Sequence, residues 1–545
     1  MGSIRVGAHR IQRRAMNPWI EAAVRRGSLL CCVVLLGAGA CGDGTTSGAP
    51  NTPAPEEPAP EEPKGPQAAN PLVEGPVTLG GGPECCFILD GGIDLREQGY
   101  RPGNPFFNDI LFDPAEVGYR RTEYFISGTA SSYESLAELT PDGLWEVEKE
   151  DAAEYRSRIV VYRPEDPSGF NGTVVVEWFN VSGGLDGAPD WMHLQTELRR
   201  SGYAWVGVSA QEVGIEGGGA FDIGLKTVDP ERYGSLVHPG DDFSYDIFSQ
   251  AAQSVRNPQG LDPLDGLVAE RLIAIGQSQS ASRLITYVNA VHPTIDLFDG
   301  FILHSLLGAS PLSESSVPTD SLRVRPDLSE PVITLQAETD VLYPSRRVAR
   351  QEDSANFRLW EVAGSAHSDL YTTLKSPSDK GDDPSVTDVT SNAEVRPPFI
   401  TCAAPANDGP GHWVTKAALR AMDRWIRTGE AAPRAERLSL NSRGSAFVVD
   451  QHGNARGGIR TPHVDVPVAT FSGFGQGNDA FCGLFGSTRL FDREKLDDLY
   501  PTNAIYVEEI GEAADAAIAA GFLLPADGEL IKRRAPKSGI GADAT

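Results

Sequence analysis

Positive charge is scarce in this chain, and the scarcity limits the partners that it can have. Its 545 residues include 47 Lys and Arg against 75 Asp and Glu, which gives a formal net charge of -28. So acidic a chain repels the phosphate backbone of DNA or RNA, and we therefore expect no nucleic-acid partner. The charge does not exclude an enzyme, because the local potential of a site can differ from that of the whole surface.

The apolar run near the N-terminus is also short. Residues 29–36 (LLCCVVLL) cannot cross a bilayer as a helix, which takes about 20 residues. Arg25 and Arg26 precede this run, and small residues then lead to Cys41. This order is typical of a secretory signal, and a Cys directly after Gly-Ala resembles a bacterial lipobox. We predict a signal peptide over 1–40 and a lipid on Cys41.

Two alternatives stay open at this end of the chain. Ala38 stands where a lipobox usually has Leu or Val, so an ordinary signal cut near Ala40, with an incidental Cys41, is the rival interpretation. The stretch before the apolar run is long, and translation from Met16 instead of Met1 would shorten it.

The next segment lacks core-forming side chains. Residues 42–70 are rich in Pro, Glu, Gly and Ala and contain a short PAPEEPAPEEP repeat, which is typical of an extended, charged tether. We therefore predict a tether over 41–70. Together with the signal and Cys41, it predicts an exported, lipid-anchored protein of the bacterial cell envelope, either periplasmic or at the cell surface. The lipid would be its only contact with a membrane.

Cysteine is infrequent, and no CxxC or Cys/His spacing indicates zinc. Beyond Cys41 the predicted mature chain keeps Cys85, Cys86, Cys402 and Cys482. Four cysteines in an exported protein favour disulfides, and three pairings are possible. We favour a Cys402–Cys482 bridge that fixes the C-terminal segment to the body of the chain. Two buried free thiols, or bridges to Cys85 and Cys86, are the alternatives.

The body of the chain alternates short apolar runs with amphipathic segments. The predicted strands are 119–127, 157–163, 173–179, 203–209, 271–276, 299–304, 331–336 and 357–363. The predicted helices are 190–201, 244–256, 279–291, 344–352 and 413–427, with a further helical segment near 505–521. Alternation of this kind predicts an α/β fold with a mostly parallel eight-stranded sheet and helices on both faces. With an antiparallel entry over 119–163, this is the α/β-hydrolase architecture.

We predict one domain over 71–545, in which residues 433–545 form a C-terminal extension packed on the core. Two long connections rich in Gly and Pro, 211–242 and 364–411, are candidate walls or lids of an active site.

One motif carries the chemistry. Residues 271–291 (RLIAIGQSQSASRLITYVNAV) place Ser278 between an apolar strand and an amphipathic helix, with the small residues Gly276 and Ser280 on either side. Strand, G-x-S-x-small and helix form the nucleophile elbow, although the second small residue is usually Gly. Large side chains at these two positions would clash with the strand and the helix. A plain Ser that caps a buried helix is the alternative.

A nucleophilic serine needs a base, and the base needs an orienting acid, which follow in the chain order Ser, acid, His. Asp340 lies four residues past strand 331–336, and Glu338 competes with it from two residues earlier. His367 lies on the loop after the last strand, where the base belongs. His304 ends a strand but precedes both acids, so a structural role suits it better, although it could line the pocket.

The oxyanion of an acyl-transfer reaction needs two preorganised N–H donors. We predict the backbone N–H of Gln279, directly after the nucleophile, as one of them. The Gly-rich loop after strand 173–179 should supply the other, from Asn180 or Val181; a plain βα turn is the alternative. Glu177, inside that strand, is expected to be a hydrogen-bonded structural carboxylate.

Several stretches resemble a family of little-characterised "alpha/beta hydrolase domain" proteins of bacteria and fungi. They include NGTVVVEWFNVSGG, GQSQSASRLITYVNAVHP, LWEVAGSAHSD and GNARGGIRTPHVDVPVAT, and the resemblance covers roughly 115–530. It implies the α/β-hydrolase fold and a triad that falls on Ser278, Asp340 and His367. It does not imply a substrate.

These features together predict a secreted, lipid-anchored serine hydrolase of a small or medium soluble ester, with no metal and no organic cofactor. An amide or peptide hydrolase is the closest rival, since the same triad serves both reactions. A surface binding module on a catalytically inactive hydrolase scaffold is a rival of a different class.

Overall fold

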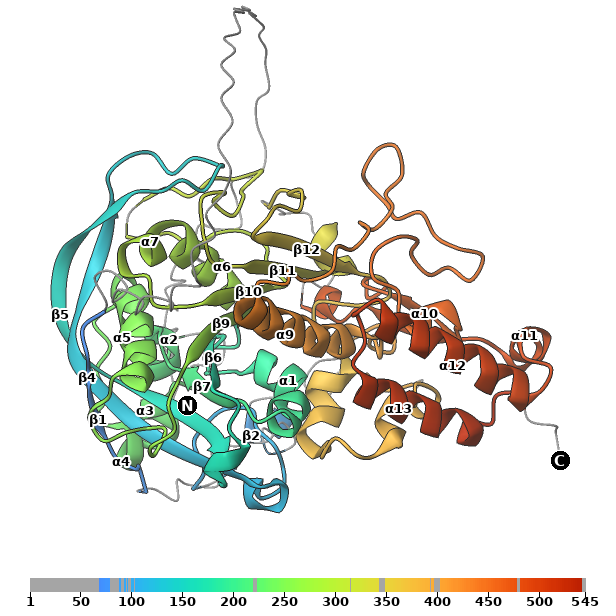
Figure 1. Cartoon of the computed structure of the whole chain (residues 1–545), viewed down its shortest axis with the longest axis horizontal. Coiled ribbons are helices and arrows are strands. Elements are labelled where there is room, and N and C mark those ends of the chain that lie inside the picture. Colours follow the sequence, from blue (N-terminus) through green and yellow to red (C-terminus); the bar gives the residue numbers. More distant parts are fainter. Residues whose placement is uncertain are drawn as a thin grey trace, which may run out of the picture. The chain divides into compact units, whose positions relative to one another are not determined.

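The continuous apolar runs become the inner strands of one large sheet (Figure 1). The structure, a computed structural model, describes residues 68–541 apart from 79–87, 90–92, 95, 97–99, 102, 219–222, 314, 343–347, 393, 397–401 and 478–480. The predicted signal, Cys41, almost all of the tether, Cys85 and Cys86 lie outside the described residues.

All eight predicted strands form, and two short strands that were not predicted extend the sheet to ten. The strands are β1 (Leu72–Glu74), β4 (Tyr119–Ser135), β5 (Val147–Pro164), β6 (Thr173–Trp178), β7 (Ala204–Val208), β8 (Gln259–Gly260), β9 (Arg271–Gln277), β10 (Gly300–His304), β11 (Val332–Ala337) and β12 (Phe357–Val362). The predicted number of eight is therefore too low, because β1 and β8 are too short to carry a hydrophobic pattern and form only by pairing.

The order across the sheet is β12-β11-β10-β9-β6-β7-β5-β4-β1-β8. Neighbours from β12 to β7 are parallel, whereas β5 and β4 join antiparallel to their neighbours, as the missing helix between them predicts. This is the α/β-hydrolase architecture, and the predicted fold class is confirmed. In parallel strands the carboxyl ends share one edge, so the loops after β9, β11 and β12 gather there.

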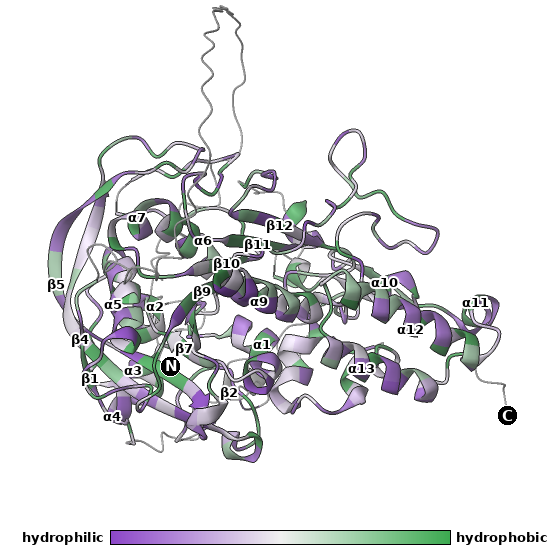
Figure 2. Ribbon diagram, viewed as in Figure 1, coloured by the Kyte–Doolittle hydropathy of each residue, from purple (hydrophilic) through white to green (hydrophobic). Residues whose placement is uncertain are grey.

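The inner strands are apolar on both faces because helices cover both. Along β6, Val174 and Val176 contact one apolar cluster while Val175 contacts another on the opposite face. In Figure 2, green hydrophobic segments mark β10 and β11 of this sheet. Because the central strands are buried on both faces, the positions of the ends of β6 and β9 are fixed. A site at this edge of the sheet needs such fixed positions.

Four helices flank the sheet next to these strands. They are α1 (Pro189–Arg200), α5 (Ser244–Arg256), α6 (Gln279–Thr286) and α9 (Gly411–Thr428). Each begins and ends within a few residues of its prediction, except that the predicted helix 279–291 changes to a π-helical turn at Tyr287–Val291. The predicted helix 344–352 is wrong over 348–352, which is not helical; its first residues lie outside the described part of the chain.

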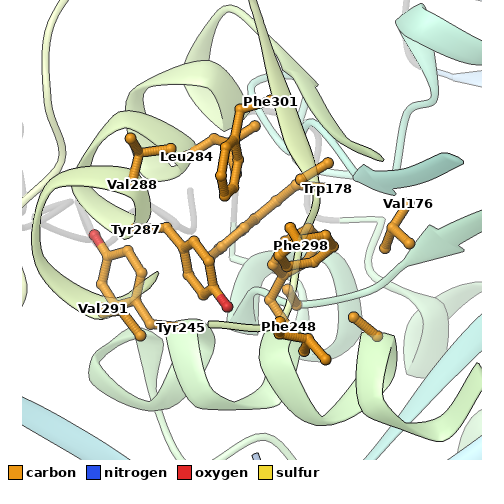
Figure 3. Packing of buried hydrophobic residues seen from close by; sticks show 14 of the residues in the cluster. Val176, Trp178, Tyr245, Phe248, Leu284, Tyr287, Val288, Val291, Phe298 and Phe301 are labelled. Carbon is orange, nitrogen blue, oxygen red and sulfur yellow. The ribbon is translucent and has the colours of Figure 1, made fainter. Parts of the chain in front are cut away.

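Aromatic packing holds α5 and α6 against the sheet. Figure 3 shows Trp178 of β6 beside Phe248 of α5, with ring centroids 4.6 Å apart. Phe248 also stacks on Phe298 at 5.4 Å, and Tyr287 meets Phe298 edge-on at 5.7 Å. Rings in such contact add stabilisation beyond the area that they bury. The start of α6 therefore rests on a rigid base.

The C-terminal extension packs on the sheet end that carries β12. Its main elements are α10 (Pro462–Asp465), β13 (Ala469–Ser472), β14 (Ser487–Leu490), α11 (Arg493–Leu499), α12 (Asn503–Ala519) and α13 (Pro525–Arg534). One apolar cluster joins its side chains to Val341 and Ala363 of the hydrolase core. Residues of both parts thus share one core.

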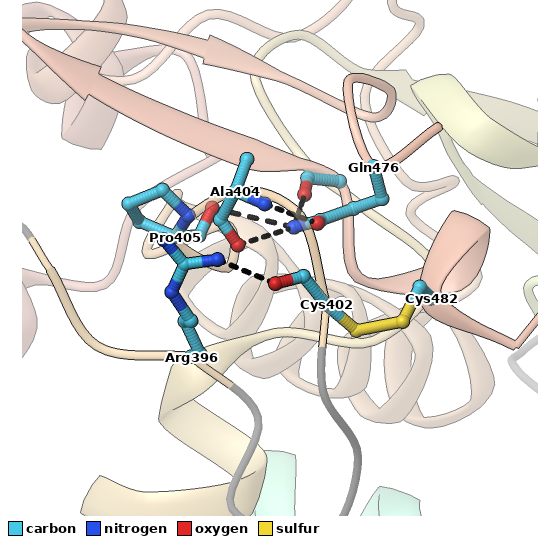
Figure 4. Close-up of a disulfide and its surroundings, with 7 residues drawn as sticks. Arg396, Cys402, Ala404, Pro405, Gln476 and Cys482 are labelled. Atoms are coloured by element: carbon cyan, nitrogen blue, oxygen red, sulfur yellow. Dashed lines mark hydrogen bonds between the residues drawn. A yellow bond between two sulfur atoms is a disulfide. The ribbon is translucent and has the colours of Figure 1, made fainter. Parts of the chain in front are cut away.

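A disulfide joins Cys402 to Cys482 across a sequence separation of 80 residues (Figure 4). Both cysteines are buried. Beside the bridge, the Gln476 side chain donates to the Ala404 carbonyl at 3.0 Å and accepts from the Ala404 N–H at 2.9 Å. The connection before α9 is therefore fixed to the extension by the disulfide and by two hydrogen bonds between the Gln476 side chain and the Ala404 backbone.

Breaking this bridge should destabilise the fold without touching the site. Closing a loop of this length removes denatured-state entropy worth about 4 kcal/mol, so Cys402→Ser with Cys482→Ser should lower the free energy of unfolding by up to that amount. Denaturant titrations of the variant and the wild type measure the difference. Peptide mapping without reductant tests the pairing itself: Cys402 found alkylated, or joined to Cys85 or Cys86, would contradict it.

Over the described residues, no helix combines the length and the apolar character that a membrane span needs.

Candidate active site

The strand-to-helix turn between β9 and α6 holds Ser278 in strained backbone. Its φ of 62° and ψ of -115° lie in a region that costs a non-glycine residue roughly 1–3 kcal/mol. The turn needs small neighbours: a Cβ on Gly276 would lie 3.0 Å from the carbonyl carbon of Ser280. Ser280 fits where glycine is usual because its hydroxyl donates to the Gln277 carbonyl at 2.8 Å.

Two side chains from later loops meet Ser278 at this turn. His367 Nε2 lies 2.7 Å from Ser278 Oγ, and His367 Nδ1 lies 2.6 Å from Asp340 Oδ1. Asp340 is fully buried and His367 is 3% exposed, whereas the Ser278 hydroxyl sits at a partly exposed turn. The structure thus brings the three predicted residues into one hydrogen-bonded chain, in the order that nucleophilic catalysis requires.

The loop that carries His367 is held from two sides. The His367 N–H donates to Thr339 Oγ1 at 3.2 Å, and the Gln277 side chain donates to the His367 carbonyl at 3.0 Å. Thr339 in turn donates to the Gly473 carbonyl at 2.7 Å. A Cβ at Gly473 would lie 2.5 Å from the Thr339 nitrogen, so only glycine allows this approach. The extension therefore supports the loop of the candidate base.

Glu338, the competing acid, is bonded elsewhere. Its carboxylate accepts the N–H of Gly364 at 2.7 Å and that of Gly473 at 2.9 Å. Complete burial raises the pKa of Glu338 to about 7, against the lowering effect of these two N–H donors. Asp340 instead accepts the Ala337 N–H at 2.7 Å with Oδ2 and leaves Oδ1 for His367. Geometry therefore favours Asp340 as the orienting acid.

The predicted oxyanion donors need one correction. Asn180 donates its backbone N–H to the Gly187 carbonyl at 2.8 Å, so this group is not free to bind an oxyanion. The Asn180 side chain donates to the Gln277 carbonyl at 2.9 Å and ties the loop to the elbow. Gln279 opens α6, where the N–H groups of the first turn lack helical partners. The Val181 N–H has no partner among the described residues.

The connection 211–242 does border the site, as predicted, and short helices interrupt it: α2 (Glu212–Glu216), α3 (Leu225–Val228) and α4 (Pro230–Tyr233). The Gln279 side chain donates to Gln211 Oε1 at 2.9 Å, and Arg283 of α6 pairs with Asp241 at 2.6 Å. No sequence motif marks Gln211, Asp241 or Arg283, because their contacts join segments that lie far apart in the chain.

The contacts of Glu177 and His304 indicate structural roles for both residues. Glu177 accepts the N–H of Asp190 at 3.0 Å and that of Trp191 at 2.7 Å, and so caps α1 from β6. His304 accepts the Ser278 N–H at 2.9 Å with its carbonyl, while its ring bonds Asp190.

A profile of the "Alpha/beta hydrolase domain" family matches residues 73–533, which is most of the chain. The chain belongs to this family. The resemblance inferred from sequence is thereby confirmed, and the profile includes most of the C-terminal extension. No protein with a curated function matches this alpha/beta hydrolase.

Solved structures resemble parts of the alpha/beta hydrolase at low similarity. XC6422 from Xanthomonas campestris, described as an a/b serine hydrolase without lid, is 16% identical, with 42% of this chain and 83% of that chain covered and a TM-score of 0.23. The rice cell wall degrading esterase LipA from Xanthomonas oryzae is 11% identical, with 34% and 43% covered and a TM-score of 0.20. At such TM-scores these likenesses carry no argument about the activity of this chain.

Proposed function

We propose that this alpha/beta hydrolase is a serine hydrolase that cleaves carboxylic esters. The observation that carries the proposal is the unbroken chain of short contacts from Ser278 through His367 to the buried Asp340, at a strained turn. Strain at one residue persists only where the surrounding structure enforces it, and such residues cluster at functional sites. A scaffold that only binds partners has no need of this arrangement.

In the proposed first step, Ser278 Oγ attacks the ester carbonyl carbon while His367 Nε2 takes the hydroxyl proton. Asp340 Oδ1 accepts the His367 Nδ1–H, fixes the tautomer and stabilises the imidazolium. The tetrahedral intermediate then collapses: the bond from carbon to the alcohol oxygen breaks, and His367 returns the proton to the leaving alcohol. Ser278 now carries the acyl group as an ester.

In the second step, water attacks the acyl-enzyme and His367 takes its proton. The tetrahedral intermediate then collapses: the bond from the acyl carbon to Ser278 Oγ breaks, His367 returns the proton to Oγ, and the carboxylic acid leaves. We assign stabilisation of both oxyanions to the backbone N–H groups of Gln279 and Val181, since that of Asn180 is bonded to Gly187. Donors fixed in advance are worth most where charge develops during the reaction.

We assign the substrate to small or medium soluble esters. The side chains beside the start of α6 are polar, namely Gln211, Asp241, Gln279 and Arg283. A long acyl chain would need an extended apolar surface at this place, because covering polar groups with an apolar chain removes their contact with water without replacing it.

Labelling with a fluorophosphonate probe tests the proposal directly. The purified protein should be labelled on Ser278, as located by peptide mass, and heat-denatured protein should not react. A panel of nitrophenyl esters of rising chain length, beside matched nitroanilides, then separates ester from amide hydrolysis. Faster turnover of the nitroanilides would favour the amide hydrolase, and no labelling at all would favour the inactive binding module.

We further propose that the hydrolase is exported and anchored to the cell envelope by a lipid on Cys41. The support is the sequence order of signal, Cys41 and charged tether. A tether of this length would hold the domain away from the membrane while leaving it free to meet soluble esters.

Replacing the anchor residue should therefore change where the protein is found. Wild-type protein should partition with membranes, whereas Cys41→Ser should move it to the soluble fraction or leave it unprocessed, because no thiol remains to carry the lipid. Fractionation followed by intact-mass analysis measures both effects. A mature wild-type N-terminus without added lipid mass would refute the anchor, and Ser278→Ala, which should fold normally, serves as the control that keeps the lipid.

A further inference from the structure

A buried cluster of two histidines and one carboxylate lies beside the elbow and takes no part in the proposed reaction. Asp190, His193 and His304 each offer one donor atom, and these three atoms lie within 4.8 Å of one another. The residues are 0%, 4% and 6% exposed. Buried polar groups of this kind need partners, because water is not available to them.

Local structure brings the three side chains together. Asp190 and His193 are three residues apart in the first turns of α1, a spacing that puts both on one face of a helix. His304 ends β10, where it is paired with Gln277 of β9, directly before the nucleophile. The Glu177 carboxylate holds the N-terminus of α1 and so fixes Asp190 relative to the sheet.

The contacts of each side chain decide which of its atoms could bind an ion. His193 Nδ1 lies 3.0 Å from the Pro189 carbonyl, a contact that needs a proton on Nδ1 and makes Nε2 the nitrogen that could bind an ion. His304 Nδ1 lies 2.7 Å from Asp190 Oδ1. Asp190 Oδ2 is buried and has no hydrogen-bond partner among the described residues.

Three buried carboxylic side chains border this cluster. Asp190 and Glu177 are both buried carboxylates, and Asp369 Oδ2 lies 3.8 Å from His193 Nε2 on the side away from Pro189. Buried charges in proteins are paired with opposite charges or coordinate metals.

We propose that Asp190, His193 and His304 bind a divalent ion of the zinc class. Imidazole nitrogen and carboxylate oxygen are ligands that zinc accepts, and three protein ligands leave a fourth position for water. His193 would ligate through Nε2 and His304 through Nδ1, with the His304 proton moved to its Nε2. The ion would clamp α1 to β10 behind the elbow. Sequence spacing gave no sign of it, because 114 residues separate His304 from Asp190.

Metal analysis of the full chain tests this site. Protein incubated with zinc and dialysed against metal-free buffer should retain about one ion per chain by mass spectrometry. Asp190→Asn and His193→Gln should each lose most of it, while Ser278→Ala should keep it. Cobalt in place of zinc should give visible absorption of a tetrahedral site in the wild type and lose it in both variants. Circular dichroism checks that the variants fold.

His292→Gln is the matched control. His292, Asp296 and Glu330 form a second, partly exposed group with suitable donor atoms. If zinc binds at Asp190, His193 and His304, then His292→Gln should retain as much zinc as the wild type. The proposal is overturned if the wild type retains less than about a tenth of an ion per chain. It is equally overturned if folded Asp190→Asn and His193→Gln both bind zinc as the wild type does, or if binding is lost with His292 instead.

Discussion

Replacing Ser278 by Ala should remove ester turnover while leaving the protein folded. The substitution deletes one oxygen from a partly exposed turn, and with it the atom that would form the acyl-enzyme. Loss of a triad nucleophile costs on the order of 10⁴-fold or more in kcat, because the covalent route disappears and only binding and oxyanion stabilisation remain. Rates with a nitrophenyl ester, compared at matched protein concentration, measure the loss.

Ser278→Gly makes this test sharper. Glycine adopts a φ of 62° at little cost, so this variant should be inactive and yet more stable than the wild type by about 1 kcal/mol. Thermal unfolding of Ser278→Gly and of the wild type shows which of the two is more stable. If Ser278→Ala hydrolysed the ester at the wild-type rate, Ser278 would not be the nucleophile, whatever the stability of Ser278→Gly.

Asp340→Asn should be nearly as damaging to turnover. The amide oxygen can replace Oδ2 as the acceptor for the Ala337 N–H, and the NH₂ group then faces His367 Nδ1. A donor at this position forces the imidazole proton onto Nε2, which can no longer accept the Ser278 proton. A change to the wrong tautomer costs about 10⁴-fold in kcat in triads of this kind. Steady-state rates measure the loss, and a folded Asp340→Asn at full rate would contradict the assignment.

Glu338→Gln is the matched control and should affect stability more than chemistry. Its amide can accept only one of the two N–H groups of Gly364 and Gly473, so one buried donor loses its partner at a cost of about 1–3 kcal/mol. The pKa of Glu338 rises from 4.5 to about 7 on folding, so its contribution to stability falls as the pH rises through this range. The stability of Glu338→Gln should lack this dependence on pH. A larger loss of kcat here than in Asp340→Asn would transfer the role to Glu338.

The elbow could be predicted from sequence because its determinants are local. An apolar strand, Gly276, Ser278, Ser280 and an amphipathic helix all lie within one stretch of chain. His367 could be found from chain order and its place after the last strand. The choice between Glu338 and Asp340 could not be settled in the same way, because it depends on backbone donors from residues 364 and 473.

Other details escaped prediction because they depend on distant partners. The position of Asn180 after β6 predicts an oxyanion donor, but the Gly187 carbonyl accepts its N–H. Residues 348–352 have helical spacing, yet Val348 pairs with Leu322 as a bridge. The strand β1 has only three residues, and its pairing with β4 rather than its composition makes it a strand.

The contact between Gly473 and the acid-bearing turn ties activity to the completion of synthesis. Gly473 follows His367 by a long stretch of chain, and its backbone bonds both Glu338 and Thr339, the latter holding the His367 N–H. A growing chain that already contains Ser278, Asp340 and His367 still lacks this support. The site should therefore reach its final geometry only after the chain beyond residue 473 has been synthesised.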